Sequence, residues 1–278
     1  MTANLPVLGL SNKESTSTED EIAPSAFLDN LTSPPLEDHL SRYTLSPELE
    51  KLYAHPSDII AVSTSHSGQW IASSCKAATP ANAVIRVFDT STYAEIATLQ
   101  SHGLTVTKLA WSPDDSLLVS VGRDRQWTLF DTQTWHVKKV MPKAHARIIW
   151  DVSFSPAELG YMFITASRDK SVKIWGGEKW DCLATVKFPE SVTSCTFLYE
   201  LVGVMTFVAV GLENGAIYIL GCERDKGHWR VIHAFVERDT PSETVTAMEW
   251  RPCGGEGRYE LAAAADDCSV RIYEVIIS

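Results

Sequence analysis

The stretch AHARIIWDVSFSPAELGYMFITASRDKSVKIW, residues 144–175, decides the fold of this chain. Apolar residues alternate with polar ones in its strand-like segments, and Ser-Pro and Arg-Asp-Lys-Ser mark the turns between them. Near its end, Asp169 is followed six positions later by Trp175. The same spacing joins Asn82 to Phe88, Asp124 to Phe130, Glu213 to Ile219 and Asp267 to Tyr273. The second members of these pairs follow one another at intervals of 42, 45, 44 and 54 residues, so one unit occurs five times.

This period is typical of WD40 blades, each of which is a four-stranded antiparallel sheet in a radial array. The sequence therefore predicts an all-β protein with a WD40 β-propeller fold, of which about five blades are recognisable. We expect the blades at residues 55–99, 100–141, 142–187, 188–236 and 237–278.

The first part of the chain has a different composition. Residues 1–10 include PVLGL, which we interpret as a strand of a preceding blade. Residues 11–54 are rich in Ser, Thr, Pro and acids, and we expect an acidic linker or long loop there. Residues 1–54 hold nine acidic and three basic side chains, so more than half of the chain's net charge of −11 lies in its first fifth.

Composition also narrows the classes of function. A net charge of −11 argues against non-specific coating of nucleic acid, which needs clustered Lys and Arg. No apolar run approaches the roughly 18 residues that cross a bilayer, so we expect no membrane contact. The start of the chain does not resemble a secretory signal, and the six cysteines occur singly. We therefore expect reduced thiols and a location in the cytoplasm and nucleus.

One set of residues resembles a Ser-His-Asp catalytic triad in composition. His145, Ser167, Asp169 and Trp175 have the spacing of the WD40 hydrogen-bond network, in which Asp orients His. We interpret them as structural, since such a network satisfies buried polar groups, and we assign His102 and Asp124 to the same network in the second blade. The sequence has no nucleophile elbow, no metal-binding pair of cysteines and no phosphate-binding glycine loop. We therefore expect no enzymatic activity, no metal and no cofactor.

A second set consists of basic and aromatic residues beside the turns of the second and third blades. Arg and Trp are enriched in interface hot spots, and Arg makes bidentate contacts with carboxylates and phosphates. We interpret the set as a candidate docking surface for an acidic protein segment or an RNA backbone. Solvated turn residues, with Trp150 buried between blades, are the alternative. The set comprises Arg123, Arg125, Arg147, Trp150, Arg168 and Lys170.

Longer runs point to a particular family. PVLGLSNK, PPLEDHLSRYTLSPELEKLYAH, VIRVFDT, SHGLTVTKLAWSPDDSLLVSVGRDRQWTLF and AHARIIWDVSFSP followed by FITASRDKSVKIW resemble the second subunit of the Elongator complex, in its C-terminal portion. The resemblance covers nearly the whole chain and is strongest at residues 34–60 and 100–176. It implies propellers of seven blades, so five blades indicate an incomplete part of such a ring.

The resemblance also implies a function. The family's members are non-catalytic scaffold subunits that join a large scaffold subunit and a radical-SAM/acetyltransferase-like catalytic subunit. The assembly modifies wobble uridines in tRNA and has been linked to histone acetylation. Contact of this chain with tRNA is expected to be indirect or peripheral at most.

Two other functions stay open on sequence grounds. A substrate receptor or adaptor of a ubiquitin ligase often ends a repeat with Trp-Asp-x-Arg, whereas this chain reads Trp175-Gly176-Gly177-Glu178. A propeller hydrolase needs catalytic groups on the axial pocket, and loss of hydrolysis on substitution of Asp169 with folding intact would support it.

Overall fold

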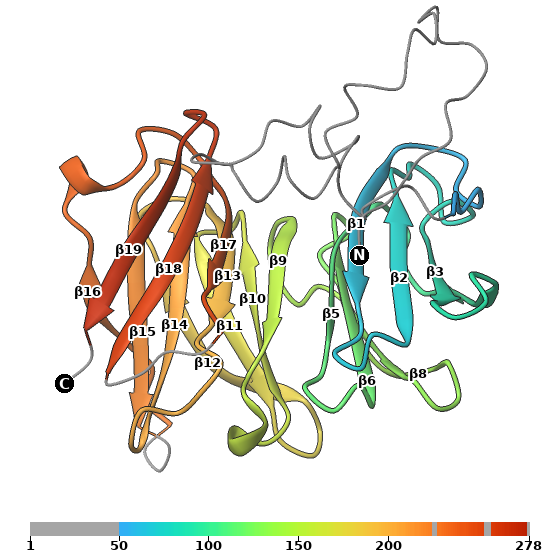
Figure 1. The fold of residues 1–278 in the computed structure, drawn as a ribbon, viewed down its shortest axis with the longest axis horizontal. Helices are drawn as coiled ribbons and strands as arrows, with labels where there is room; N and C mark the ends of the chain where they lie inside the picture. The colour runs from blue at the N-terminus through green and yellow to red at the C-terminus, as the bar shows by residue number, and fades with distance from the viewer. Residues whose placement is uncertain (1–49, 224–226, 253–256, 277–278) are drawn as a thin grey trace, which may run out of the picture. The chain divides into compact units, whose positions relative to one another are not determined.

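In the computed structural model, the structure describes residues 50–223, 227–252 and 257–276. The strand expected within residues 1–10 and the segment 11–49 lie outside the described residues. The chain divides into residues 1–53 and 54–278, and the second unit holds all the described strands. It contains five antiparallel sheets that follow one another along the chain, from β1–β3 at one side of Figure 1 to β17–β19 at the other.

We name the sheets blades A to E. Blade A comprises β1 (Ile59–Thr64), β2 (Trp70–Cys75), β3 (Val84–Asp89) and β4 (Glu95–Gln100). Blade B comprises β5 (Val106–Trp111), β6 (Leu117–Gly122), β7 (Trp127–Asp131) and β8 (His136–Met141). Blade C comprises β9 (Ile149–Phe154), β10 (Met162–Ser167), β11 (Ser171–Gly176) and β12 (Asp181–Lys187). Blade D comprises β13 (Val192–Phe197), β14 (Met205–Leu212), β15 (Ile217–Glu223) and β16 (Arg230–Ala234). Blade E comprises β17 (Val245–Trp250), β18 (Arg258–Ala265) and β19 (Val270–Ile276).

The hydrophobic core lies between the blades. The first strands of successive blades, β1, β5, β9, β13 and β17, lie side by side. Four clusters of buried apolar side chains fill the four junctions from A–B to D–E. At the A–B junction, the rings of Trp70 and Trp111 stack at 5.8 Å and Trp135 meets Trp70 edge-on at 5.3 Å. Each blade is therefore stabilised by its neighbours, because its strands bury their apolar faces against the next sheet.

Polar contacts fix the register between blades. The Asp115 carboxylate of blade B accepts the backbone N–H groups of His66 and Ser67 in blade A, both at 2.7 Å. The hydroxyl group of Thr107 donates to the carbonyl oxygen of Ile149 in blade C at 2.6 Å. Thr107 is the bulged residue of β5, where one extra residue shifts the pairing with β6. The bulge therefore directs a side chain toward the next blade.

Both ends of the array expose apolar side chains. On β1, Ile59 and Val62 are 49% and 60% exposed, and on β19, Val270 and Ile272 are both 72% exposed. Among the described strands, no junction like the other four joins β17 to β1. Among the described residues, blade E has three strands where the other blades have four. The array is propeller-like and open in the described part of the chain, as expected of an incomplete ring.

Candidate functional site

The imidazole of His145 lies at the centre of a buried network in blade C. Its side chain is 0% exposed, and its Nδ1 lies 3.0 Å from Asp169 Oδ2. Because an ionised carboxylate can only accept, Nδ1 carries the ring proton and donates a hydrogen bond to Asp169. The ring's Nε2 lies 2.7 Å from the hydroxyl oxygen of Thr165, which also accepts the indole N–H of Trp175 at 2.9 Å. The hydroxyl group between His and Trp therefore belongs to Thr165.

The sequence prediction placed Ser167 in this role, and the structure corrects it. The Ser167 hydroxyl instead donates to the carbonyl oxygen of Ile148 at 2.9 Å and accepts the Asp169 N–H at 3.1 Å. The physical reason is the position of Ser167 at the end of β10, beside the bulge in the pairing with β9. Thr165 lies two residues earlier, far enough along the strand to reach the His145 ring.

The same hydroxyl position recurs in blades A and B. His102 Nε2 lies 2.7 Å from Ser120 Oγ and its Nδ1 lies 3.0 Å from Asp124 Oδ2. In blade A, His55 Nε2 lies 2.8 Å from Ser73 Oγ. Ser73, Ser120 and Thr165 each stand two residues before the end of the second strand of a blade. This common offset is the sequence signal that identifies the hydroxyl partner.

Electrostatics favour one protonation state for the blade C network. Burial lowers the pKa of His145 below 6.5, and the nearby Asp169 offsets this effect only in part. For Asp169, burial alone raises the pKa, but hydrogen bonds from His145 and Ser171 outweigh it and hold the pKa well below 3.8. At neutral pH the pair is therefore a neutral imidazole and an ionised carboxylate. The imidazole is turned toward Thr165, and no substrate-accessible nucleophile is present within this set of residues.

These directions predict how stability depends on pH. Both groups bind protons less readily in the folded chain, so the unfolded chain takes up more protons as the pH falls. We expect the free energy of unfolding to decline first below pH 6.5, where unfolded His145 becomes protonated, and further below about pH 4 as Asp169 follows. Urea unfolding at several pH values measures this decline. Asp169→Asn should flatten its acid part, and an unchanged slope would contradict the assignment.

The candidate docking residues of blades B and C lie on the surface. Arg123, Arg125, Arg147 and Arg168 are exposed. Within the described part of the chain, no hydrogen bond or ion pair engages their guanidinium groups. The carbonyl oxygen of Arg125, in the β6–β7 turn, accepts the N–H of His145, so the turn of blade B borders the loop that carries Arg147. Four uncommitted guanidinium groups are thus presented along adjoining turns and loops.

Lys170 and Trp150 differ from these arginines. The Lys170 ammonium group donates to the carbonyl oxygen of Pro189 at 2.7 Å and lies 3.2 Å from Glu190 Oε2. Trp150 is half-buried and stands at the bulge of β9, the position that Thr107 occupies in β5. At the equivalent position in blade B, the Thr107 hydroxyl group donates to the carbonyl oxygen of Ile149 in blade C, whereas blade C has an indole group there. Lys170 therefore has local partners for its charge, and Trp150 is only partly accessible.

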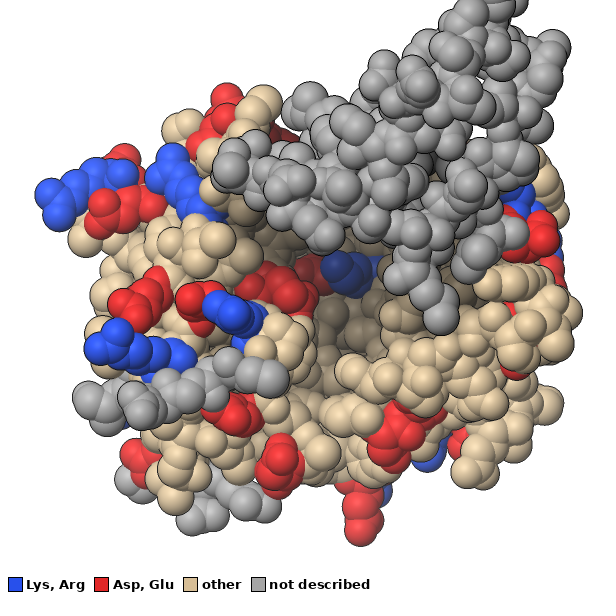
Figure 2. Space-filling view, in the orientation of Figure 1, with Lys and Arg blue, Asp and Glu red and all other residues tan. Residues whose placement is uncertain are grey.

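Two cavities lie away from these turns. A channel of about 440 Å³ opens among the first strands of the blades, and Figure 2 shows a hollow there with acidic and basic side chains at its wall. In it, Lys108 Nζ lies 3.5 Å from Asp151 Oδ1, and Asp151 Oδ2 accepts the Ser194 hydroxyl and the Cys195 N–H. Burial raises the pKa of Cys195 well above its usual value, so this thiol stays protonated and is a poor nucleophile.

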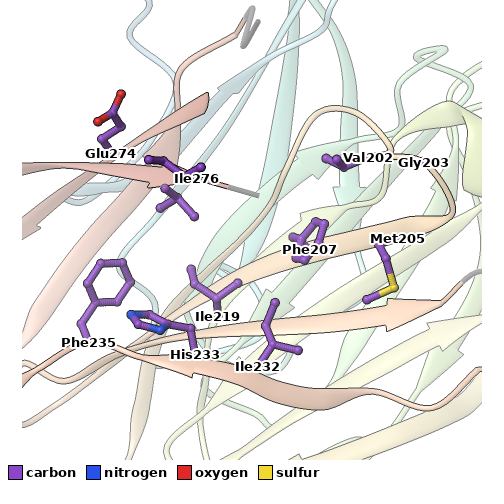
Figure 3. A pocket seen from close by; sticks show the side chains of 11 residues that line it. Val202, Gly203, Met205, Phe207, Ile219, Ile232, His233, Phe235, Glu274 and Ile276 are labelled. Carbon is purple, nitrogen blue, oxygen red and sulfur yellow. The ribbon is translucent and has the colours of Figure 1, made fainter. Parts of the chain in front are cut away.

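The second cavity, of about 780 Å³, lies between blades D and E and is shown in Figure 3. Its wall is mostly apolar, with Phe207, Ile219 and Phe235 among the lining residues. Glu274 and His233 are its charged or titratable members, and Glu274 is paired with Arg258 at 3.3 Å. Such a wall offers mainly apolar contact. Across the described residues, no group of three or more His, Cys, Asp or Glu side chains is placed to hold a metal ion.

Repeated antiparallel sheets, cores between blades and buried His–Asp pairs define the chain as a WD40-repeat protein. The model of the family "WD domain, G-beta repeat" matches residues 46–89, 94–131 and 136–176. Over nearly its whole length, the chain is similar to proteins named Elongator complex protein 2. None of the helices in the described residues is long and apolar enough to cross a membrane.

Three relatives illustrate this similarity. Elongator complex protein 2 of Schizosaccharomyces pombe is 38% identical over 290 residues, which cover 99% of this chain and 38% of that protein. Its namesake from Saccharomyces cerevisiae is 36% identical over 295 residues, covering 98% and 37%. The Homo sapiens protein of that name is 31% identical over 333 residues, covering 98% and 39%. The chain therefore spans well under half the length of these relatives.

Proposed function

We propose that the chain is a non-catalytic scaffold subunit of an Elongator-type complex, acting in the cytoplasm and nucleus. In this role it supports an assembly that modifies wobble uridines in tRNA, with a link to histone acetylation. Its partners are a large scaffold subunit and a radical-SAM/acetyltransferase-like catalytic subunit. The observation that carries the proposal is the similarity to Elongator complex protein 2 along almost the whole chain.

The surface of blades B and C supports a role in docking. Uncommitted guanidinium groups retain their full capacity for bidentate contacts with carboxylates of another protein. By contrast, the His–Asp pairs are buried and engaged, and the channel thiol of Cys195 stays protonated. These features favour binding over chemistry, and the chemistry of the assembly is assigned to its catalytic partner.

Affinity purification tests the proposal. The tagged chain is expressed at native level, and co-purifying proteins are identified by mass spectrometry. We expect a large scaffold subunit and a radical-SAM acetyltransferase with the unchanged chain, and about tenfold less of both with Arg123→Glu/Arg168→Glu. Lys138→Glu/Lys179→Glu makes the same change in net charge on other surfaces and should retain them.

Each outcome has a defined meaning. Recovery of a cullin-type ubiquitin ligase would replace the proposal with the adaptor function. Recovery of chaperones alone would show that this length of chain does not enter an assembly. Equal loss with both double variants would show that general acidification, rather than the blade B and C surface, weakens docking.

A further inference from the structure

One backbone hydrogen bond recurs in all five blades and defines equivalent positions. The residue directly after the second strand donates its N–H to the carbonyl oxygen of the residue directly before the first strand. The donors, from blade A to blade E, are Lys76 (to Asp58, 2.8 Å), Arg123 (to Thr105, 2.9 Å), Arg168 (to Ile148, 3.0 Å), Glu213 (to Ser191, 2.9 Å) and Asp266 (to Thr244, 2.9 Å). We call these five donors the charged arc. All five residues are exposed, and the repeat places them on the same end of their blades.

The charges of the arc are ordered along the array. Blades A, B and C contribute cations, and blades D and E contribute anions. Neighbouring loops have the same order, since the residue before the acceptor is Arg147 in blade C, Glu190 in blade D and Glu243 in blade E. Where the two halves meet, Lys170 of blade C lies 3.2 Å from Glu190 of blade D. The arc is therefore basic over three blades and acidic over two. In blade A the acceptor residue Asp58 is itself an exposed acid, so the excess of positive charge lies over blades B and C.

The charged groups of the arc are available to a ligand. In the described residues, no hydrogen bond or ion pair engages the side chains of Arg123, Arg168, Glu213 or Asp266. The aspartates of the adjoining turns behave differently, because Asp124 and Asp169 accept hydrogen bonds from buried histidines. Opposite charges of the arc lie on different blades, and among the described residues beside the arc Lys170 and Glu190 pair at the boundary between the two halves. A partner that approaches this face thus meets two regions of opposite electrostatic potential.

The order of charge discriminates between classes of partner. A nucleic acid backbone is uniformly negative, so it gains from blades A to C and is repelled by blades D and E. A polypeptide can carry both signs, and electrostatic complementarity then fixes its direction as well as its affinity. We propose that this face binds a polypeptide segment whose acidic residues lie over blades A to C and whose basic residues lie over blades D and E. The proposal rests on the docking function above and specifies the partner's chemistry.

Fluorescence anisotropy with the full chain tests the proposal. The probe is a fluorescein-labelled peptide with about six Glu residues, a flexible Gly-Ser spacer and about six Lys residues, at about 50 and 150 mM NaCl. We expect Arg123→Glu/Arg168→Glu and Glu213→Lys/Asp266→Lys each to weaken binding by about tenfold. Lys138→Glu/Lys179→Glu, away from the arc, should leave the affinity within about twofold.

Two further probes separate the alternatives. A uniformly acidic peptide should bind the unchanged chain more weakly than the two-sign peptide, and Glu213→Lys/Asp266→Lys should reverse that preference. Unchanged affinity of the two-sign peptide for Glu213→Lys/Asp266→Lys overturns the proposal. Tighter binding of a labelled single-stranded RNA than of the two-sign peptide also overturns it and assigns the face to nucleic acid.

The outcome is independent of the co-purification test. If the assembly co-purifies with the tagged chain while Glu213→Lys/Asp266→Lys leaves the affinity for the two-sign peptide unchanged, the scaffold function stands and the two-sign partner is rejected. If the peptide preference is found but no assembly is recovered, the charged arc binds a polypeptide outside an Elongator-type complex.

Discussion

Replacement of Gly215 by Ala is expected to lower the free energy of unfolding by about 4 kcal/mol. Gly215 has a φ of +84° in the turn between β14 and β15, a region that Cβ-bearing residues rarely adopt. A Cβ atom there would lie 2.0 Å from the carbonyl oxygen of Pro241, in the connection that leads to blade E. Because the obstacle is backbone, relief requires the connection around Pro241 to shift away from the turn that holds Gly215. Urea unfolding followed by tryptophan fluorescence measures the loss.

Gly203 offers a matched control for this substitution. Its φ is +63°, and nothing lies within 4 Å of the position where a Cβ would stand. Gly203→Ala therefore bears the conformational cost of a left-handed residue, about 1–2 kcal/mol, without the clash. Equal losses for the two variants would show that the approach of Pro241 to Gly215 does not constrain the junction.

Asp169→Ala is expected to cost about 3 kcal/mol. The carboxylate accepts the His145 Nδ1–H at 3.0 Å, the Ala146 N–H at 2.9 Å and the Ser171 hydroxyl at 2.5 Å. Its removal leaves a fully buried imidazole without the acceptor that orients it, and the link through Thr165 to Trp175 loses its support. Chemical unfolding gives the loss of stability, and near-ultraviolet circular dichroism reports on the packing of Trp175.

Asp131→Ala provides the comparison for Asp169. Asp131 accepts the N–H groups of Gln133 and Thr134 in an exposed turn, where water can replace it. We expect a much smaller loss of stability from Asp131→Ala than from Asp169→Ala. A loss of hydrolytic activity in Asp169→Ala with unchanged stability would contradict the structural interpretation of the network and favour the hydrolase.

The repeat could be predicted from the sequence because each blade is specified by short patterns of neighbouring residues. Alternating apolar residues and turn signals around Asp124 and Asp169 recur at a nearly constant interval, and these determine the fold class. The sequence prediction did not include Ser120 and Thr165, whose hydroxyl groups contact His102 and His145. It assigned the role in blade C to Ser167, which lies just before the turn. A strand places alternate side chains on one face, and the offset of two residues becomes visible only when blades are aligned on their strand ends.

The charged arc could not be predicted from spacing alone. No single residue type or sign of charge is common to its members, which range from Lys76 and Arg123 to Glu213 and Asp266. An insertion after β2 also obscures the turn of blade A. Their equivalence rests on backbone hydrogen bonds to loops about 20 residues earlier in each blade. The sequence prediction therefore identified Arg123 and Arg168, where Arg precedes Asp in two blades, and included neither Lys76 nor the acidic half.

The placement of each core between two blades also affects how the repeats can diverge. Leu109 and Trp111 of blade B share a cluster with Ile85 of blade A, while Leu117 and Val119 share another with Phe163 of blade C. A volume change on one face of a blade must be matched by the neighbour on that side, because contacting residues couple energetically. We therefore expect substitutions on facing sides of adjacent blades to depend on one another. The two faces of one blade can then change independently, because each belongs to a different core cluster.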